Sequence, residues 1–153
     1  MKKLFFETDA SWSLSILRIL LGVVVLAHGA QKLLGLFGGY GFTGTMTFFT
    51  DTMGLPWLVG FVIILLESVG AVALIAGIAT RFIAFAYTLL ALGIVFTTHI
   101  QNGFFMNWFG NMAGEGYEYF LLWIGMSLAL FISGGGKYSL DRVISPKQKS
   151  SHA

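Results

Sequence analysis

Four long apolar stretches, separated by polar or glycine-rich connections, set the pattern of this chain. They cover residues 13–36, 57–79, 82–101 and 117–134. Each is close to the roughly 20 residues that an α-helix needs to cross the hydrocarbon core of a bilayer. We therefore predict an all-α membrane protein, in which residues 1–142 form a single bundle of four transmembrane helices.

The composition favours a membrane protein over a soluble one. Of the 153 residues, 56% are hydrophobic and only 10% are charged, whereas soluble domains carry roughly 25% charged residues. The net charge is only +2 and no basic surface interleaved with aromatic residues is evident, so the expected partner is the lipid bilayer and no nucleic acid is expected. The chain has no cysteine, which excludes a disulfide framework, a thiolate metal site and thiol chemistry by the chain itself.

The basic residues predict an orientation in the membrane. Seven of the nine Lys and Arg side chains fall on one side of the predicted bundle, one falls near the other side, and one lies within the first helix. Because Lys and Arg are enriched in cytoplasmic loops, both termini and the tight turn at 77–81 are predicted to be cytoplasmic. The glycines at 134–136 are expected to end the fourth helix, and residues 143–153 are expected to form a disordered cytoplasmic tail.

The two connections on the opposite side are rich in glycine and aromatic residues. In the first, from Gly38 to Pro56, residues 43–49 are expected to form a short interfacial helix or a re-entrant segment. The second, residues 101–109, is too aromatic to be a free loop. Because irregular backbone at membrane depth must be buried in protein or line a cavity, both connections are expected to cap the outer end of the bundle.

Ionisable side chains within the apolar stretches are the candidate functional residues, because such groups are costly at bilayer depth and usually face the bundle interior. These residues are Arg18, His28, Lys32, Glu67 and His99, with Glu118 at the mouth of the last stretch. With about 100° per residue, Arg18, His28 and Lys32 share an arc of the first helix with Gly22, Val25 and Gly29. Glu67 shares a face with small residues of the second helix, and Glu118 is expected to share a packed face with Leu121, Leu122, Gly125 and Ala129.

The predicted depths suggest two polar layers. Glu67 lies about 15 Å and His28 roughly 12 Å below the outer ends of their helices, at 1.5 Å per residue, so the two side chains could meet. His99 and Glu118 lie closer to the outer rim and could form a second layer above them. Lys32 is expected to extend its ammonium group to the membrane interface.

Several interpretations of this polar set stay open. The buried pair could simply fix the helix register, while Arg18 could bond a backbone carbonyl or the buried carboxylate. A His/Glu cavity also suits a quinone-like or phenolic ligand. A metal or haem held by His28 and His99 is a weaker alternative, and the absence of a Glu-x-x-His pair argues against a di-iron site. Transport of a small solute or proton is a further alternative.

Short motifs in a fixed order resemble those of the DoxX family. They are His28-Gly29-Ala30-Gln31-Lys32-Leu33, Gly54-Leu55-Pro56 leading to Glu67, Gly77-Ile78-Ala79-Thr80-Arg81, His99 followed by Gly103-Phe104-Phe105, and Gly136-Lys137-Tyr138-Ser139-Leu140-Asp141. The resemblance covers about residues 12–142. It implies a four-helix protein of the bacterial inner membrane, with relatives associated with a terminal quinol oxidase, thiosulfate:quinone oxidoreduction, redox stress and the detoxification of quinones or catechols.

The leading hypothesis is therefore a redox-associated accessory protein that binds a quinone-like or other small apolar ligand. His28 and Glu67 would form the core of the site and His99 and Glu118 its mouth, with Arg18 and Lys32 as further candidates. The alternatives are a non-enzymatic scaffold subunit that works beside a redox enzyme, possible as a homo-oligomer, and a small-solute transporter. The cofactor and any catalytic activity of the chain itself stay open.

Overall fold

Helices make up the regular structure of the chain in the computed structural model, which describes residues 10–144. Three helical segments are long and apolar enough to cross a membrane: Trp12–Leu34, Trp57–Ala76 and Thr80–Asn102. The first is the uninterrupted helix α2 (Trp12–Leu34). The described residues contain no strand. The chain is therefore a multi-pass, all-helical membrane protein, as its sequence predicts.

The second and third segments contain π-helical turns. The second consists of α4 (Trp57–Leu65), the π-helical η3 (Leu66–Gly70) and α5 (Ala71–Ala76). The third consists of α6 (Thr80–Ile94), the π-helical η4 (Val95–His99) and the 3₁₀ turn η5 (Ile100–Asn102). Because π-helical turns are rare and frequently occur at functional sites, the positions of Glu67 in η3 and His99 in η4 are notable.

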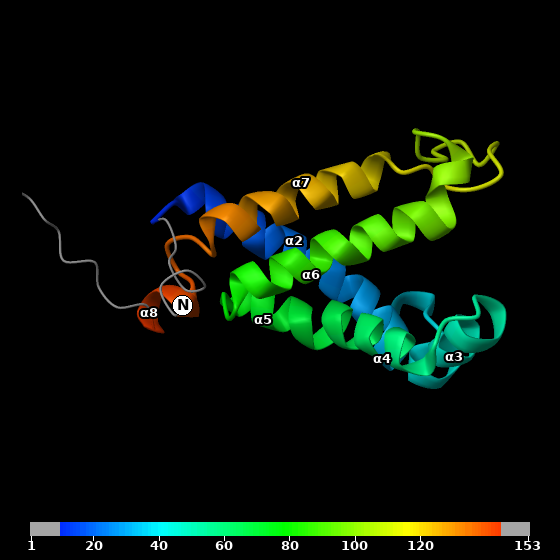
Figure 1. Cartoon of the computed structure of the whole chain (residues 1–153), viewed down its shortest axis with the longest axis horizontal. Coiled ribbons are helices and arrows are strands. Elements are labelled where there is room, and N and C mark those ends of the chain that lie inside the picture. Colours follow the sequence, from blue (N-terminus) through cyan, green and yellow to red (C-terminus); the bar gives the residue numbers. More distant parts are fainter. Residues whose placement is uncertain (1–9, 145–153) are drawn as a thin grey trace, which may run out of the picture.

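The fourth apolar stretch forms a shorter helix, α7 (Glu118–Ser133), of 16 residues. At 1.5 Å per residue it is about 24 Å long, somewhat less than the roughly 30 Å hydrocarbon core. It lies alongside α6 in the bundle (Figure 1). Length and composition thus identify three crossing helices, with α7 packed against them as a shorter apolar helix.

The packed face of α7 differs from the predicted one. The buried residues are Phe120, Trp123, Ser127 and Leu130, whereas Leu121, Leu122 and Gly125 are exposed. The prediction that Leu121, Leu122 and Gly125 pack in the bundle with Glu118 was therefore wrong. Large aromatic side chains fill the contact with α6, and a Cβ added to Gly125 would meet no atom within 4 Å, so this glycine does not mark a close helix contact.

One end of the bundle is closed by the two turns that the glycines predicted. Gly77 adopts φ +74° after α5, and α7 ends at Ser133 just before Gly134. The chain then continues to a short helix, α8 (Leu140–Ile144), at the same end as the start of α2 (Figure 1). Residues 143 and 144 of the predicted disordered tail thus belong to α8, and the rest of that tail lies outside the described residues.

The opposite end of the bundle carries both long connections. The first contains the 3₁₀ turn η1 (Leu36–Gly38), α3 (Gly41–Thr47) and the π-helical η2 (Phe48–Thr52). The short helix expected within 43–49 is therefore present, and Met46 and Phe49 form a small core with Ile64 of α4. The second connection folds back on itself through backbone hydrogen bonds, including that from Glu118 N to Phe104 O (2.9 Å). Both connections are thus ordered caps on this end of the bundle.

Candidate functional site

The only ion pair among residues 10–144 joins two helices in the interior of the bundle. Lys32 Nζ of α2 donates to Glu67 Oε2 of η3 at 2.5 Å. The Glu67 side chain is only 3% exposed, whereas that of Lys32 is 25% exposed. The carboxylate is therefore enclosed by protein while its ammonium partner reaches toward the surface. This Lys32–Glu67 pair is the centre of the candidate site.

A glycine determines which side chain of α2 reaches Glu67. A Cβ on Gly29 would lie only 2.1 Å from Glu67 O and 2.7 Å from Ser68 N, so α2 and η3 come into direct backbone contact here. At about 100° per residue, Lys32 is rotated roughly 60° from Gly29 around the helix and His28 roughly 100°. The long Lys32 side chain can span its smaller offset, whereas His28 lies on the exposed side of α2.

Two sequence-based expectations about α2 are thereby corrected. The structure brings Lys32 to Glu67, whereas the sequence analysis expected His28 there. Lys32 was expected to reach for the membrane interface because lysine commonly extends in this way near helix ends. A buried carboxylate within reach of its ammonium group outweighs that tendency, because an unpaired charge in the interior is costly.

Two phenol groups lie near enough to the buried carboxylate for its charge to act on them. Tyr87 of α6 is fully buried and its hydroxyl donates to Leu66 O at 3.0 Å. This carbonyl belongs to the first residue of η3, so the hydrogen bond fixes the turn that carries Glu67. The charge of Glu67 acts electrostatically on the phenols of both Tyr87 and Tyr119. Glu67 therefore lies near two phenols, of which Tyr87 already uses its one donor hydrogen on the backbone of η3.

Aromatic rings extend from these phenols along α7. Trp123 contacts Tyr87 edge-on at 5.7 Å between ring centroids, and Tyr119 at 6.1 Å. The buried Trp123 Nε1 and Ser127 Oγ have no hydrogen-bond partner among residues 10–144. Unsatisfied buried donors are costly. These two atoms lie one helical turn apart and are available for hydrogen bonds within an otherwise aromatic interior.

Arg18 lies at the other end of α2 and does not take part in the Lys32–Glu67 pair. Its side chain is 1% exposed and donates to Leu74 O (3.0 Å), Ile75 O (2.5 Å) and Tyr138 O (3.2 Å). Of the two partners foreseen for Arg18, the backbone carbonyls are the ones observed. It ties α2 to the end of α5 and to the segment after α7, which is a structural role.

His99 and Glu118 lie at the end of the bundle that carries the two long connections, where each holds the second connection in place. His99 Nδ1 is 2.7 Å from Glu115 O, and its ring packs on Phe120 at 4.7 Å. Glu118 accepts hydrogen bonds from Met106 N (2.9 Å) and Trp108 Nε1 (3.3 Å). No hydrogen bond joins His99 to Glu118 in the described structure, so they do not form the second polar layer that was expected.

A metal centre finds no support in the arrangement of residues 10–144. Within this range no three His, Asp or Glu side chains are grouped as metal ligands would be. His28 faces outward from α2, and His99 is directed to the backbone of the outer connection. The histidine pair considered for haem or metal is therefore not assembled.

Sequence reasoning missed Tyr87, Tyr119 and Trp123 as neighbours of the site. Aromatic residues make up 16% of the chain, so three more on helices do not stand out. The available signal was the spacing of Tyr119, Trp123 and Ser127 at four-residue intervals, which places them on one face of a helix. That face proves to be the buried one for Trp123 and Ser127.

Comparisons with known proteins identify a family. The profile of the DoxX family matches residues 13–100, which include all of α2 but its first residue, the π-helical turn η3 and both residues of the Lys32–Glu67 pair. A Bacillus subtilis (strain 168) protein named "Putative oxidoreductase CatD" is 28% identical over 135 residues, which cover 88% of this chain and 89% of that protein. No solved structure matches the chain.

Proposed function

Since this chain belongs to the DoxX family, we propose that it is a redox-associated protein of the bacterial inner membrane that binds a quinone-like ligand at the Lys32–Glu67 pair. The observation that carries this proposal is the enclosed Glu67 carboxylate bonded to the partly exposed Lys32 ammonium group. Ionisable groups inside a membrane protein are expensive and mark ligand or proton sites by default. The name of the Bacillus relative, an oxidoreductase, fits a redox setting.

The chemistry of the pair matches the two redox forms of such a ligand. A quinone presents carbonyl oxygens that accept hydrogen bonds, and Lys32 Nζ is a donor that reaches toward the surface. A quinol presents hydroxyl groups that donate, and the Glu67 carboxylate is an acceptor. The buried aromatic residues Tyr87 and Trp123 supply the apolar surroundings that small-molecule sites generally have.

We also propose that α7 is the fourth membrane crossing. Four crossings place both termini on one side of the membrane, which agrees with the seven-to-one distribution that the sequence predicts for the Lys and Arg residues other than Arg18. The 16 residues of α7 can cross if flanking residues of the outer connection and the glycines after it complete the span, or if the bilayer thins locally. Both termini are then cytoplasmic.

Binding of a short-chain quinone tests the function. The purified protein in mild detergent is titrated with ubiquinone-1, and quenching of tryptophan fluorescence is recorded. Glu67→Gln and Lys32→Gln keep the approximate size of each side chain but remove its charge. Because hydrogen bonds to charged groups contribute about 1.5–3 kcal/mol, each variant is expected to weaken binding roughly tenfold or more.

His28→Gln is the matched control because His28 lies one turn from Lys32 on the exposed side of the same helix. It is expected to bind like the unmodified protein. A Glu67→Gln variant that elutes as a folded protein and still binds the quinone would refute the proposal. Loss of binding in His28→Gln but not in Lys32→Gln would show that the site was assigned to the wrong residue.

A scaffold subunit of a redox complex is the second candidate function. It is favoured by the fact that Lys32 and Glu67 already satisfy each other, so their pairing could serve helix packing alone. The same Glu67→Gln variant separates the two proposals. A scaffold would lose its co-purifying protein partners in this variant, and the unmodified protein would show no saturable quinone binding.

A further inference from the structure

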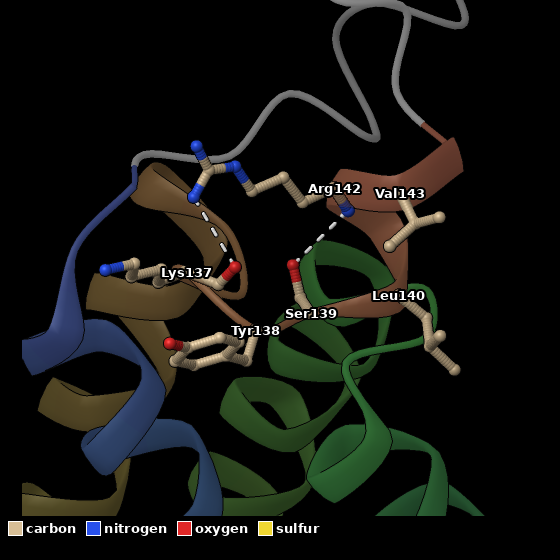
Figure 2. A pocket seen from close by; sticks show the side chains of 6 residues that line it. All are labelled: Lys137, Tyr138, Ser139, Leu140, Arg142 and Val143. Carbon is tan, nitrogen blue, oxygen red and sulfur yellow. Dashed lines mark hydrogen bonds between the residues drawn. The ribbon is translucent and has the colours of Figure 1, made fainter.

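A depression of about 390 Å³ lies at the end of the bundle opposite the long connections. Its lining comes from the segment between α7 and α8 and from α8 itself: Lys137, Tyr138, Ser139, Leu140, Arg142 and Val143. Figure 2 shows the cationic side chains of Lys137 and Arg142 together with the apolar side chains of Leu140 and Val143 around this space. This depression, the α8 pocket, is separate from the Lys32–Glu67 pair.

The α8 pocket carries two positive charges that no described carboxylate neutralises. Lys137 Nζ lies over the ring of Trp12 at 4.9 Å and near that of Tyr138 at 5.7 Å. Within the described residues, Arg142 Nη1 donates to Lys137 O alone, at 3.4 Å. Asp141, which lies between them in sequence, is buried and accepts from Ala79 N and Thr80 N at 2.8 Å each. Its carboxylate is therefore already engaged on the opposite side of the segment.

The rest of the pocket wall is apolar and exposed. Val143 is 79% and Leu140 45% exposed. Trp12 and Tyr138 are also exposed and contact each other edge-on at 4.9 Å. Exposed Trp and Tyr at the end of an apolar helix are typical of the membrane interface. The pocket thus combines phosphate-binding cations with a surface suited to hydrocarbon.

The backbone that carries both cations is held rigidly against the bundle. Asp141 N donates to Gly77 O at 2.8 Å, and Arg18 Nη2 donates to Tyr138 O at 3.2 Å. The Ser139 hydroxyl is buried and donates to Gly136 O. A site whose backbone is already ordered loses less entropy when a ligand binds.

From these observations we propose that the α8 pocket binds the headgroup of an anionic phospholipid. Lys137 Nζ and the Arg142 guanidinium bond the phosphate oxygens, and Leu140 and Val143 contact the glycerol and the first acyl carbons. The apolar wall beside the cations does not strengthen the binding of a free phosphate ion. It does strengthen the binding of a lipid, which carries hydrocarbon next to its phosphate. Juxtamembrane Lys and Arg are attracted to anionic lipids by a sequence-independent electrostatic force, which the ordered pocket makes site-specific.

Native mass spectrometry of the full chain in detergent tests this proposal. The protein is mixed with equal amounts of phosphatidylglycerol and phosphatidylcholine, and the bound lipids are counted. Two cations near a phosphate are expected to give a preference for phosphatidylglycerol of roughly 10- to 30-fold. The variant Lys137→Gln/Arg142→Gln should lose this preference, and Val143→Asn should weaken the binding of both lipids while keeping both cations.

The control variant Lys147→Gln/Lys149→Gln removes two positive charges from the sequence that follows α8. It should retain the preference if the α8 pocket, and not overall charge, selects the lipid. The proposal is overturned if the Lys137/Arg142 variant keeps the preference, or if the control loses it to the same degree. It is also overturned if inorganic phosphate displaces the lipid at equal concentration, because the pocket would then be a site for free anions.

Discussion

Replacing Gly29 by alanine tests the close approach of α2 and η3 on which the candidate site depends. The added Cβ would lie 2.1 Å from Glu67 O and 2.4 Å from Glu67 C. Both are backbone atoms, so no side-chain rotation relieves the clash. Since carbon atoms in contact prefer separations of roughly 3.5–4 Å, the two helices must separate by about 1 Å or more. The pairing of Lys32 with Glu67 is expected to weaken as they do so.

The size of the effect follows from one stabilising and two destabilising contributions. Alanine is ordinarily better than glycine within a helix by roughly 0.5–1 kcal/mol. Overpacking costs about 1–3 kcal/mol, and weakening a hydrogen bond to a charged group costs up to about 1.5–3 kcal/mol more. We expect the Gly29→Ala protein to lose roughly 2–4 kcal/mol of stability, which for a chain of this size lowers the thermal midpoint by on the order of 10 °C.

Thermal unfolding in detergent, followed by circular dichroism, provides the measurement. Gly93→Ala and Gly125→Ala are matched controls because a Cβ at either position would meet no atom within 4 Å. Their thermal midpoints should stay constant or rise by a few degrees. If Gly29→Ala also leaves the midpoint unchanged or raises it, the helices do not make the backbone contact described here, and the explanation for the choice of Lys32 fails with it.

Three further predictions concern the polar interactions of the bundle. Lys32→Gln and Glu67→Gln should each destabilise the protein by about 3–5 kcal/mol. The double variant should lose clearly less stability than the two single variants added together. Additive losses in this double-mutant cycle would contradict an interaction between Lys32 and Glu67. Arg18→Gln should cost about 2 kcal/mol or more, since three carbonyls lose a charged donor, and an unchanged denaturation midpoint would rule out this role. Tyr87→Phe should cost about 0.5–1.5 kcal/mol in the same assay, whereas Tyr138→Phe, at an exposed ring, should be neutral.

The helices and turns could be predicted from sequence because several independent signals coincide there. Apolar length indicates a crossing helix, and glycine indicates the turn that follows. Gly77 with φ +74° and the short α5–α6 connection illustrate this agreement. The packed face of α7 was less predictable, because small residues mark close contacts in membranes only on average, and here Trp123 and Phe120 fill the contact.

Only some residues of the candidate site could be predicted from the sequence. Glu67 could be identified as a candidate, since a lone carboxylate in an apolar stretch is costly at membrane depth and usually marks a functional site. Its partner could not, because His28 and Lys32 lie one turn apart and differ mainly in rotation around α2 and in reach. The role of Tyr87 depends on the carbonyl of Leu66 in a π-helical turn, and the periodicity of hydrophobic residues does not indicate where such a turn forms.

The partners of Arg18 have a consequence for how the protein is made. Its side chain bonds carbonyls that lie 56, 57 and 120 residues farther along the chain. At a synthesis rate of about 5–20 residues per second, the guanidinium waits several seconds for α5 and longer still for Tyr138. During that time α2 is in the membrane, or at its edge, with a charge that its own helix cannot satisfy. The first helix therefore does not reach its final depth when it inserts. That depth is fixed only after α7 and Tyr138 have emerged from the ribosome and Arg18 has all three of its carbonyl partners.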